Sequence, residues 1–412
     1  MISSRSALTI LLTALLLCAS GAAARGRQPT DPADPGPFAV GFRLIGVSPD
    51  GGLPFTAWLF YPATSNGYGR ALDATGAPYP AVAFGHAYLA PPLLYAATAR
   101  HLASWGYAVV LPRTGVQLVP YIPAFAGDLT EALDELERRD SEPRSFLFGA
   151  IDVTSRGLAG HSMGGGAAIL AAAGDPRVRA LVGFSPSETF WPVSAVERIS
   201  AVEAAVVLLA GTADVITPPE VHQRPMFENA AAPRILATLD GGGHCAYAPA
   251  IPSCGGTLAR ERQIRIAQRW LVATFNLYLK EDTRFADWVW GPLAEDPAVE
   301  VLADAGFEVE PSSTRGSAGP GRTATHELTL THGGDGRSSY SLTTDCDAWQ
   351  ITAPSDTGPL DPGETRTIRV DIRVPALPAR STDRCSVVVT PRLDGLTRHS
   401  AELVISATAL DR

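Results

Sequence analysis

The sequence has little lysine and no cluster of basic residues. Lys280 is the one lysine among 33 basic residues, and no run of arginines stands out. Because the formal net charge is −9, we expect no nucleic-acid partner. Beyond the N-terminal segment, no stretch reaches the roughly 18 uninterrupted apolar residues that a membrane-spanning helix needs. With 46% hydrophobic and 18% charged residues, the composition is that of a globular chain and excludes general disorder.

The N-terminus has the three parts of an export signal. Arg5 supplies a positive charge, residues 8–17 form a short apolar core, and residues 22–24 fit an A-x-A cleavage site. We therefore predict a signal peptide over residues 1–24 and a secreted protein, either extracellular or periplasmic. Cys18 follows a leucine, where a lipoprotein signal has a small residue, so lipid anchoring at Cys18 is not expected.

Signal cleavage would leave four cysteines in an oxidising compartment. Four cysteines allow three pairings, and proximity in the sequence favours Cys245 with Cys254 and Cys346 with Cys385. A zinc site that includes His244, Cys245 and Cys254 is the alternative. Their spacing is poor for zinc, so we expect two disulfides and no metal.

The pattern of the chain predicts two domains of different class. Residues 25–37 are rich in proline, glycine and aspartate and are expected to be a flexible lead-in. Over residues 38–310, short apolar runs alternate with helical patterns, which is typical of an α/β fold with a mostly parallel sheet. Residues 311–322 have the composition of a linker. Short alternating runs over residues 323–412 predict a small all-β, immunoglobulin-like sandwich.

Periodicity also places the elements of the larger domain. An antiparallel hairpin is expected at the start, and strands and helices alternate after it. A long helix closes the domain after the last strand. The expected hairpin strands are 38–45 and 55–61, the later strands are 81–84, 108–111, 180–184, 205–210 and 234–239, and the helices are 92–105, 124–139 and 258–279.

Residues 160–164 read Gly-His-Ser-Met-Gly and match the G-x-S-x-G pattern of a nucleophile elbow. A short apolar run precedes the motif and an alanine-rich helical run follows it, so a strand would lead through a sharp turn directly into a helix. Glycines two residues on either side of Ser162 leave room for so tight a turn. The alternative is a glycine-rich turn of some other α/β sheet. The order of strand, motif and helix favours Ser162 as a nucleophile.

A nucleophilic serine needs an adjacent base and an acid that orients the base. In this type of sheet the acid and then the histidine follow the serine along the chain. Asp214 follows one predicted strand and His244 follows the next, on a glycine-rich loop, so both lie at the carboxyl edge of the sheet. Read alone, Asp214 also fits a turn that caps Thr217, and His244 fits a surface loop. Asp240 and Glu188 are the alternative acids.

Acyl transfer also needs N–H donors for the oxyanion of the tetrahedral intermediate. The amide of Met163, directly after the nucleophile, is the first. The second is expected just after the first parallel strand, at the amide of His86 or, as the alternative, of Ala87. The His86 ring and three aromatic side chains are expected to form the wall of an acyl pocket, with ordinary core packing as the alternative: Tyr88, Phe190 and Trp191.

Taken together, residues 38 to about 302 resemble the α/β-hydrolase superfamily. The resemblance rests on the phrases AVAFGHAYLAPP, HLASWGYAVVLPRTG, GLAGHSMGGGAAI, LLAGTADVITPP and GGGH. It is strongest to the dienelactone hydrolases, the chlorophyllases and the bacterial cutinases, which are polyester hydrolases. The resemblance implies Ser162 as nucleophile, Asp214 as acid, His244 as base, and the amides of His86 and Met163 as oxyanion donors. The β-rich tail lies outside the resemblance.

The sequence therefore predicts a secreted serine ester hydrolase that forms an acyl-enzyme and needs no metal or organic cofactor. Its partner would be a small-molecule, lipid or polyester substrate; the oligomeric state is not specified. A peptidase or lactonase is the rival among enzymes. The rival from another class is an inactive protein whose C-terminal domain binds a polymer or a cell surface. For that domain alone, the sequence is equally compatible with a role as a binding module and a role as an inert spacer.

Overall fold

The computed structural model describes residues 30–189, 191–249, 251–252, 254–334, 337–376, 382–391 and 399–407. The chain divides into the units Met1–Thr30 and Asp31–Arg412, and the second unit contains all the elements below. The signal peptide predicted over residues 1–24, with Cys18, lies outside the described residues. In the part of the chain that is described, no helix is long and apolar enough to cross a membrane.

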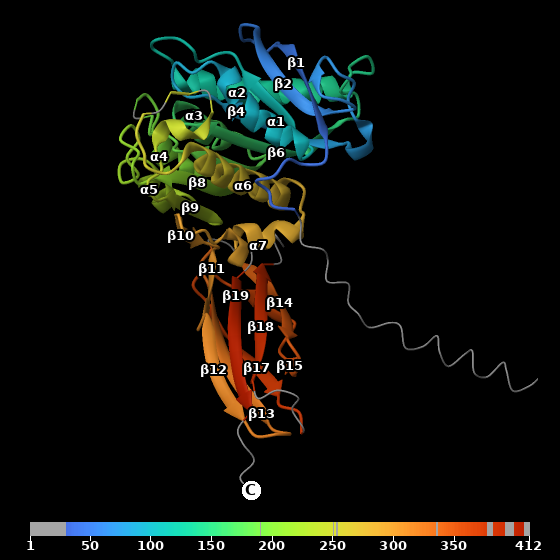
Figure 1. Cartoon of the computed structure of the whole chain (residues 1–412), viewed down its shortest axis with the longest axis vertical. Helices are drawn as coiled ribbons and strands as arrows, with labels where there is room; N and C mark the ends of the chain where they lie inside the picture. Colours follow the sequence, from blue (N-terminus) through green and yellow to red (C-terminus); the bar gives the residue numbers. More distant parts are fainter. Residues whose placement is uncertain are drawn as a thin grey trace, which may run out of the picture. The chain divides into compact units, whose positions relative to one another are not determined.

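A ten-stranded mixed sheet with the strand order β10-β9-β8-β7-β6-β4-β5-β2-β1-β3 forms the first and larger part of the fold (Figure 1). Its centre, from β5 to β9 in space, is parallel, whereas β1, β2 and β10 join antiparallel. The strands are β1 Ala39–Val47, β2 Phe55–Ala63, β3 Gly67–Tyr68, β4 Tyr79–Gly85, β5 Ala108–Pro112, β6 Ile151–His161, β7 Val178–Phe184, β8 Ala205–Gly211, β9 Arg234–Leu239 and β10 Val299–Asp304.

Helices cover both faces of this sheet because its central strands are apolar on both sides. In β4, Val82 and Phe84 belong to one core layer, and Ala81 and Ala83 belong to the other. The first layer includes side chains from α1 Ala96–Ser104, α6 Arg260–Leu279 and α7 Ala286–Val289, and the second includes side chains from α2 Ile122–Ser141, α3 Met163–Ala172, α4 Ala195–Arg198 and α5 Gln223–Asn229. Short 3₁₀ turns are η1 Ala74–Gly76, η2 Pro92–Tyr95, η3 Ile199–Ala201, η4 His244–Tyr247, η5 Thr283–Phe285 and η6 Pro292–Ala294.

The C-terminal part consists of two small sheets, β11-β13-β17-β15 and β12-β19-β18-β14-β16. Their inward side chains form a third apolar core. The predicted fold class, a mostly parallel α/β sheet followed by an all-β sandwich, is confirmed. The strands are β11 Phe307–Glu310, β12 Ser313–Ala318, β13 Thr323–His332, β14 Ser338–Cys346, β15 Gln350–Thr352, β16 Asp356–Leu360, β17 Thr365–Arg373, β18 Thr382–Pro391 and β19 His399–Ala407.

The prediction of a flexible lead-in is wrong for its described residues, which are held against α1 and α6. The carboxylate of Asp31 accepts a hydrogen bond of 2.9 Å from Nη2 of Arg269. The carbonyl of Asp34 accepts one of 2.9 Å from Nε1 of Trp105. Because these partners are distant in the sequence, the local composition of the segment could not reveal them.

The junction between the two parts also differs from the prediction. The large sheet does not end at β9, because β10 pairs antiparallel with it. β11 pairs with β13, so the small sheets begin before residue 310. Within the predicted linker, β12 pairs parallel with β19. The serine- and glycine-containing composition of β12 is typical of a linker, but backbone hydrogen bonds to a distant strand do not depend on side-chain type.

The strand that leads to residue 162 contains a buried arginine. The guanidinium of Arg156 in β6 is fully buried and contacts Asp175 at 2.7 Å, Asp134 at 2.5 Å and Glu137 at 2.5 Å. Asp134 and Glu137 belong to α2, and Asp175 follows α3. The network therefore ties β6 to α2 and to the segment that follows α3. A buried charge is tolerated only when it is paired in this way.

We predict that Arg156→Met lowers the free energy of unfolding by about 3–5 kcal/mol, because it removes the cation at the centre of a buried cluster. Urea denaturation would measure the loss. Arg177→Met is the matched control: Arg177 also contacts Asp175, but its side chain is 48% exposed, so its loss should cost less than about 1 kcal/mol. Equal losses for the two variants would contradict this account.

Candidate active site

Ser162 lies at the turn between β6 and α3 in a backbone conformation that L-residues rarely adopt, with φ 56° and ψ −121°. The turn is possible because its neighbours lack side chains. A Cβ at Gly160 would lie 2.3 Å from the carbonyl oxygen of Gly164, and a Cβ at Gly164 would lie 2.2 Å from the carbonyl carbon of Gly85. The motif therefore has the backbone geometry that the sequence predicts.

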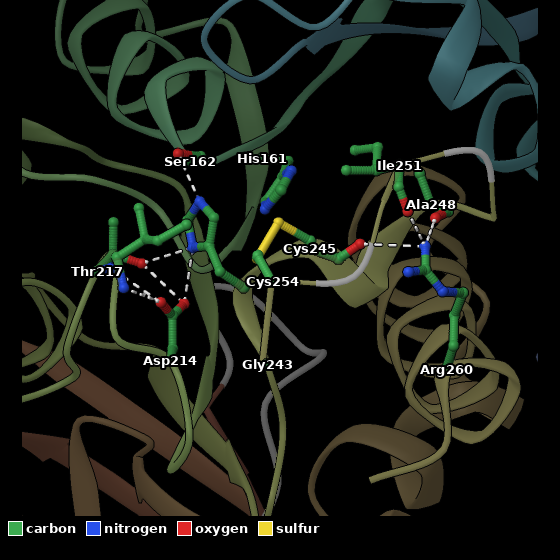
Figure 2. The surroundings of a disulfide bond; sticks show 12 residues. His161, Ser162, Asp214, Thr217, Gly243, Cys245, Ala248, Ile251, Cys254 and Arg260 are labelled. Atoms are coloured by element: carbon green, nitrogen blue, oxygen red, sulfur yellow. Dashed lines mark hydrogen bonds and ion pairs between the residues drawn. A yellow bond between two sulfur atoms is a disulfide. The ribbon is translucent and has the colours of Figure 1, made fainter. Parts of the chain in front are cut away.

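Ser162, His244 and Asp214 form one chain of hydrogen bonds, drawn as dashed lines in Figure 2. Nε2 of His244 lies 2.9 Å from Oγ of Ser162, and Nδ1 lies 2.8 Å from Oδ2 of Asp214. All three residues are buried. Since a carboxylate only accepts, Nδ1–H donates to Asp214 and the lone pair of Nε2 faces the serine hydroxyl. This arrangement can take a proton from Ser162.

Asp214 both caps a turn and orients the histidine, so the two interpretations of this residue are compatible. Its Oδ1 accepts hydrogen bonds from the N–H groups of Ile216 at 3.0 Å and Thr217 at 2.8 Å. Its Oδ2 accepts one of 2.9 Å from the hydroxyl of Thr217, which also lies 3.0 Å from Nδ1 of His244. Burial alone would raise the pKa of Asp214, but the hydrogen bond and the charge of His244, followed by the N–H of Thr217, hold the pKa below its usual value.

The two alternative acids have other partners. Oδ1 of Asp240 lies 3.3 Å from the hydroxyl of Thr212. The carboxylate of Glu188 accepts hydrogen bonds from the N–H groups of Ala195 and Val196 at the start of α4. The structure therefore brings Asp214, among the three candidate acids, to His244.

The loop that carries His244 is fixed by the first turn of α6. The side-chain amide of Gln263 accepts from the N–H of Gly243 at 3.0 Å and donates to its carbonyl at 2.8 Å. On the other side of the histidine, the guanidinium of Arg260 donates to the carbonyl of Ala248 at 2.6 Å (Figure 2). Sequence reasoning missed Gln263 and Arg260, because nothing in a helix start indicates which loop it will contact.

Both predicted disulfides are present. Cys245 and Cys254 close a short loop directly after His244 (Figure 2), and Cys346 and Cys385 join β14 to β18. Within the described residues, the one cluster of metal-type ligands consists of Cys346, Cys385 and Asp383. Its two sulfurs are bonded to each other, and Asp383 accepts hydrogen bonds from backbone N–H groups, so this cluster does not fit a metal.

Two backbone amides can face an oxyanion beside Ser162. Met163 is the first residue of α3, so its N–H has no acceptor within the helix. His86 follows β4, whose last residue packs directly on the backbone of Gly164. The N–H of Ala87 donates to the hydroxyl of Tyr95 at 3.3 Å. This contact favours His86 over Ala87 as the second donor.

The side chain of His86 does not wall an open pocket as expected. Its ring is buried against Phe125, and its Nε2 lies 2.7 Å from the carbonyl of Thr114. Burial lowers the pKa of His86, and the two neighbouring carbonyls only partly offset this. The sequence could not show the direction of the ring, because that direction depends on the loop after β5.

Tyr88 and Trp191 lie on the surface, with exposed fractions of 48% and 82%, so the core-packing alternative is wrong for both. The hydroxyl of Tyr88 donates to the carbonyl of Leu118 at 2.6 Å, which joins the loops after β4 and β5. Phe190 lies outside the described residues. Other exposed apolar side chains follow the carboxyl ends of β4, β5 and β8, and we call them, with Tyr88 and Trp191, the apolar rim: Leu89, Val116, Leu118, Val119, Tyr121, Val215, Ile216 and Val221.

His161 packs its ring against that of His244, with 4.8 Å between the ring centroids. Its Nδ1 lies 2.7 Å from the hydroxyl of Tyr95. Burial, and then the charge of His244, lowers the pKa of His161 to about 3. His161 is therefore a neutral neighbour of His244.

A family profile and several known proteins are similar in sequence to this chain. The sequence profile of a family described as PET hydrolase-like matches residues 19–304, and the match ends with β10. A cutinase of Thermobifida fusca (strain YX) is 27% identical over 297 residues, covering 69% of this chain and 86% of that protein. Cutinase 1 of Thermobifida cellulosilytica is 26% identical over 274 residues, covering 64% and 90%. Cutinase est2 of Thermobifida alba is 24% identical over 286 residues, covering 68% and 82%.

The low pKa of His161 predicts a pH-dependent stability. Between about pH 3 and pH 6.5 the unfolded chain binds a proton at this residue and the folded chain does not, so the free energy of unfolding should fall as the pH is lowered. His161→Phe should reduce the loss between pH 7 and pH 4.5 by about 2–3 kcal/mol. Urea denaturation at both pH values measures it. All other residues are the same in the wild type and the variant, so their contributions cancel in this comparison. Parallel pH curves for the two proteins would contradict the prediction.

Proposed function

This chain belongs to the PET hydrolase-like family and is a carboxylic ester hydrolase, and from that premise we propose that it works through Ser162, His244 and Asp214. The observation that carries the proposal is the continuous chain of hydrogen bonds from Oγ of Ser162 through the imidazole to the carboxylate. An inactive protein, the rival from another class, is disfavoured because each member of this chain lies within hydrogen-bond distance of the next.

In the proposed mechanism, Nε2 of His244 takes the proton of Ser162 while Oγ attacks the ester carbonyl carbon. The negative charge on the carbonyl oxygen is stabilised by the N–H groups of Met163 and His86. The imidazolium then gives its proton to the leaving alcohol, and an acyl-enzyme remains. Water loses a proton to Nε2 and attacks the acyl carbon. The acid departs as Ser162 recovers its proton from His244.

Asp214 holds the imidazole in the tautomer that this cycle needs. Because its pKa lies below the usual value, it stays ionised across the neutral range and stabilises the imidazolium that forms in each half of the reaction. The hydroxyl of Thr217 contacts both the carboxylate and Nδ1 of His244, which restricts the movement of this pair. These contacts supply orientation before the substrate binds.

We propose polymeric esters as the substrate class. The apolar rim is exposed on several loops at the same edge of the sheet as Ser162. An exposed apolar surface beside a reactive group suits an extended polymer chain, whereas a small ester is best held in an enclosed pocket. The description of the family as PET hydrolase-like and the naming of the relatives as cutinases support the same class.

We also propose that the protein is secreted and that the sandwich is a spacer. The two disulfides and the N-terminal export pattern both support an oxidising destination. Among the described residues, the large apolar side chains that are exposed all lie between Leu44 and Val301. The described surface of the sandwich therefore offers no aromatic platform for a polymer, which favours the spacer over the binding module.

We predict that Ser162→Ala lowers kcat for p-nitrophenyl butyrate by at least about a thousandfold, because the nucleophile is lost. A fluorophosphonate probe should label the wild-type protein and leave this variant unlabelled. Ser104→Ala is the control, since Ser104 is a buried serine in α1 whose hydroxyl donates to the carbonyl of His101, and it should keep the labelling. Full esterase activity in the Ser162 variant would refute the proposed nucleophile.

We predict that Trp191→Ala slows hydrolysis of a polyester film by about fivefold, since one exposed aromatic contact contributes about 1 kcal/mol. The value of kcat/KM for a soluble ester should stay within about twofold, because the proposal assigns the rim to the extended polymer and not to a small substrate. Phe148→Ala is the matched control. Phe148 is also exposed, but it precedes β6, at the opposite edge of the sheet. The same loss on film and soluble ester would argue against docking through the rim.

A further inference from the structure

Tyr95 is fully buried beneath the proposed oxyanion donors, at the start of α1. Its hydroxyl oxygen lies 3.3 Å from the backbone nitrogen of Ala87, just after β4. The same oxygen lies 2.7 Å from Nδ1 of His161, at the end of β6. One side-chain atom thus bridges the ends of two neighbouring parallel strands. The mechanism proposed above gives this residue no role.

The direction of the two hydrogen bonds follows from the chemistry of the groups. The backbone N–H of Ala87 can only donate, so the oxygen of Tyr95 accepts from it. Among the described residues, Nδ1 of His161 is the acceptor within hydrogen-bond distance of the hydroxyl proton, so Tyr95 is assigned as the donor and the ring proton of His161 to Nε2. Burial raises the pKa of Tyr95, so the phenol keeps this proton. His161 is neutral beside His244 and is therefore able to accept.

This bridge lies close in the sequence to both proposed oxyanion donors. His86 precedes Ala87, and Met163 follows His161 by two residues, so the hydroxyl is one residue from the first donor and two from the second. Beyond Ala87 the loop is open to solvent, because Tyr88 and Leu89 are about half exposed. The ring of His86, which contacts the carbonyl of Thr114, is the other buried anchor of this loop.

We propose that Tyr95 is a positioning residue for the oxyanion hole. By engaging the N–H of Ala87, it turns that group away from the reacting carbonyl and leaves the N–H of His86 as the second donor. By donating to His161, it fixes the distance between this loop and the turn that carries Met163. The inference rests on the proposed function, since it assumes that the amides of His86 and Met163 stabilise the oxyanion.

The test compares Tyr95→Phe with Tyr107→Phe in the full chain. Tyr107 is also fully buried, and its hydroxyl donates to Oδ1 of Asn276 at 2.8 Å, below the amino end of β5. Tyr95→Phe should lower kcat for p-nitrophenyl butyrate by about tenfold, with KM within about twofold, because a misplaced donor weakens stabilisation of the transition state. Tyr107→Phe should leave both constants unchanged, even if its melting temperature falls.

A transition-state analogue gives a readout that a purely structural role would not move. A phenylboronic acid forms a tetrahedral adduct with a nucleophilic serine, and its inhibition constant should rise about tenfold in Tyr95→Phe and stay constant in Tyr107→Phe. If Tyr95→Phe loses thermal stability but keeps kcat and this inhibition constant, the proposal is wrong.

His161→Phe is the second variant, because it keeps an aromatic ring beside His244 and removes the acceptor for Tyr95. If the two residues act through one bridge, the double variant should be no slower than the more impaired single variant. If the losses in kcat of the two single variants multiply in the double variant, the two residues act independently and the proposed bridge is wrong. Failure of the proposed function can be distinguished from failure of this inference. If the proposed function is wrong, Ser162→Ala keeps its activity. If only this inference is wrong, activity depends on Ser162 but not on the hydroxyl of Tyr95.

Discussion

Direct contact between two backbones governs the rest of the structure. The turn after β6 lies so close to the end of β4 that a Cβ at Gly164 would be 2.2 Å from the carbonyl carbon of Gly85. This contact places two strand ends side by side, supports the unusual backbone angles of Ser162 and brings the amides of His86 and Met163 to one place. Any side chain at Gly164 would separate these groups, so the site depends on the absence of a side chain.

Around this contact, the carboxylate of Asp214 and the backbone of Gly243 are buried but paired. Asp214 accepts from four donors, and Gln263 satisfies both backbone groups of Gly243. Farther down β6, three carboxylates surround Arg156. Because unpaired polar groups are costly in a dry interior, such networks hold the proposed nucleophile, base and acid in one arrangement without help from a substrate.

The sequence predicted those parts of the molecule whose signal is local. Ser162 lies in a short motif, and Asp214 and His244 each follow a recognisable strand, so their order along the chain indicated a common edge of the sheet. Tyr95, Gln263 and Arg260 gave no such signal, because their partners are set by tertiary packing. Composition misled at the lead-in, where Asp31 is bound by an arginine of α6, and at β12, where a linker-like sequence pairs with β19.

The pairing of β12 with β19 has a consequence for synthesis on the ribosome. β12 is an edge strand, and its neighbour in the sheet is the strand formed by residues 399–407. The large sheet, by contrast, has all its strands once residue 304 has emerged. The ester-cleaving part can therefore reach its native fold before the sandwich is complete. Until residues 399–407 have emerged, residues 313–318 lack the strand with which they pair and can pair with other nascent chains instead.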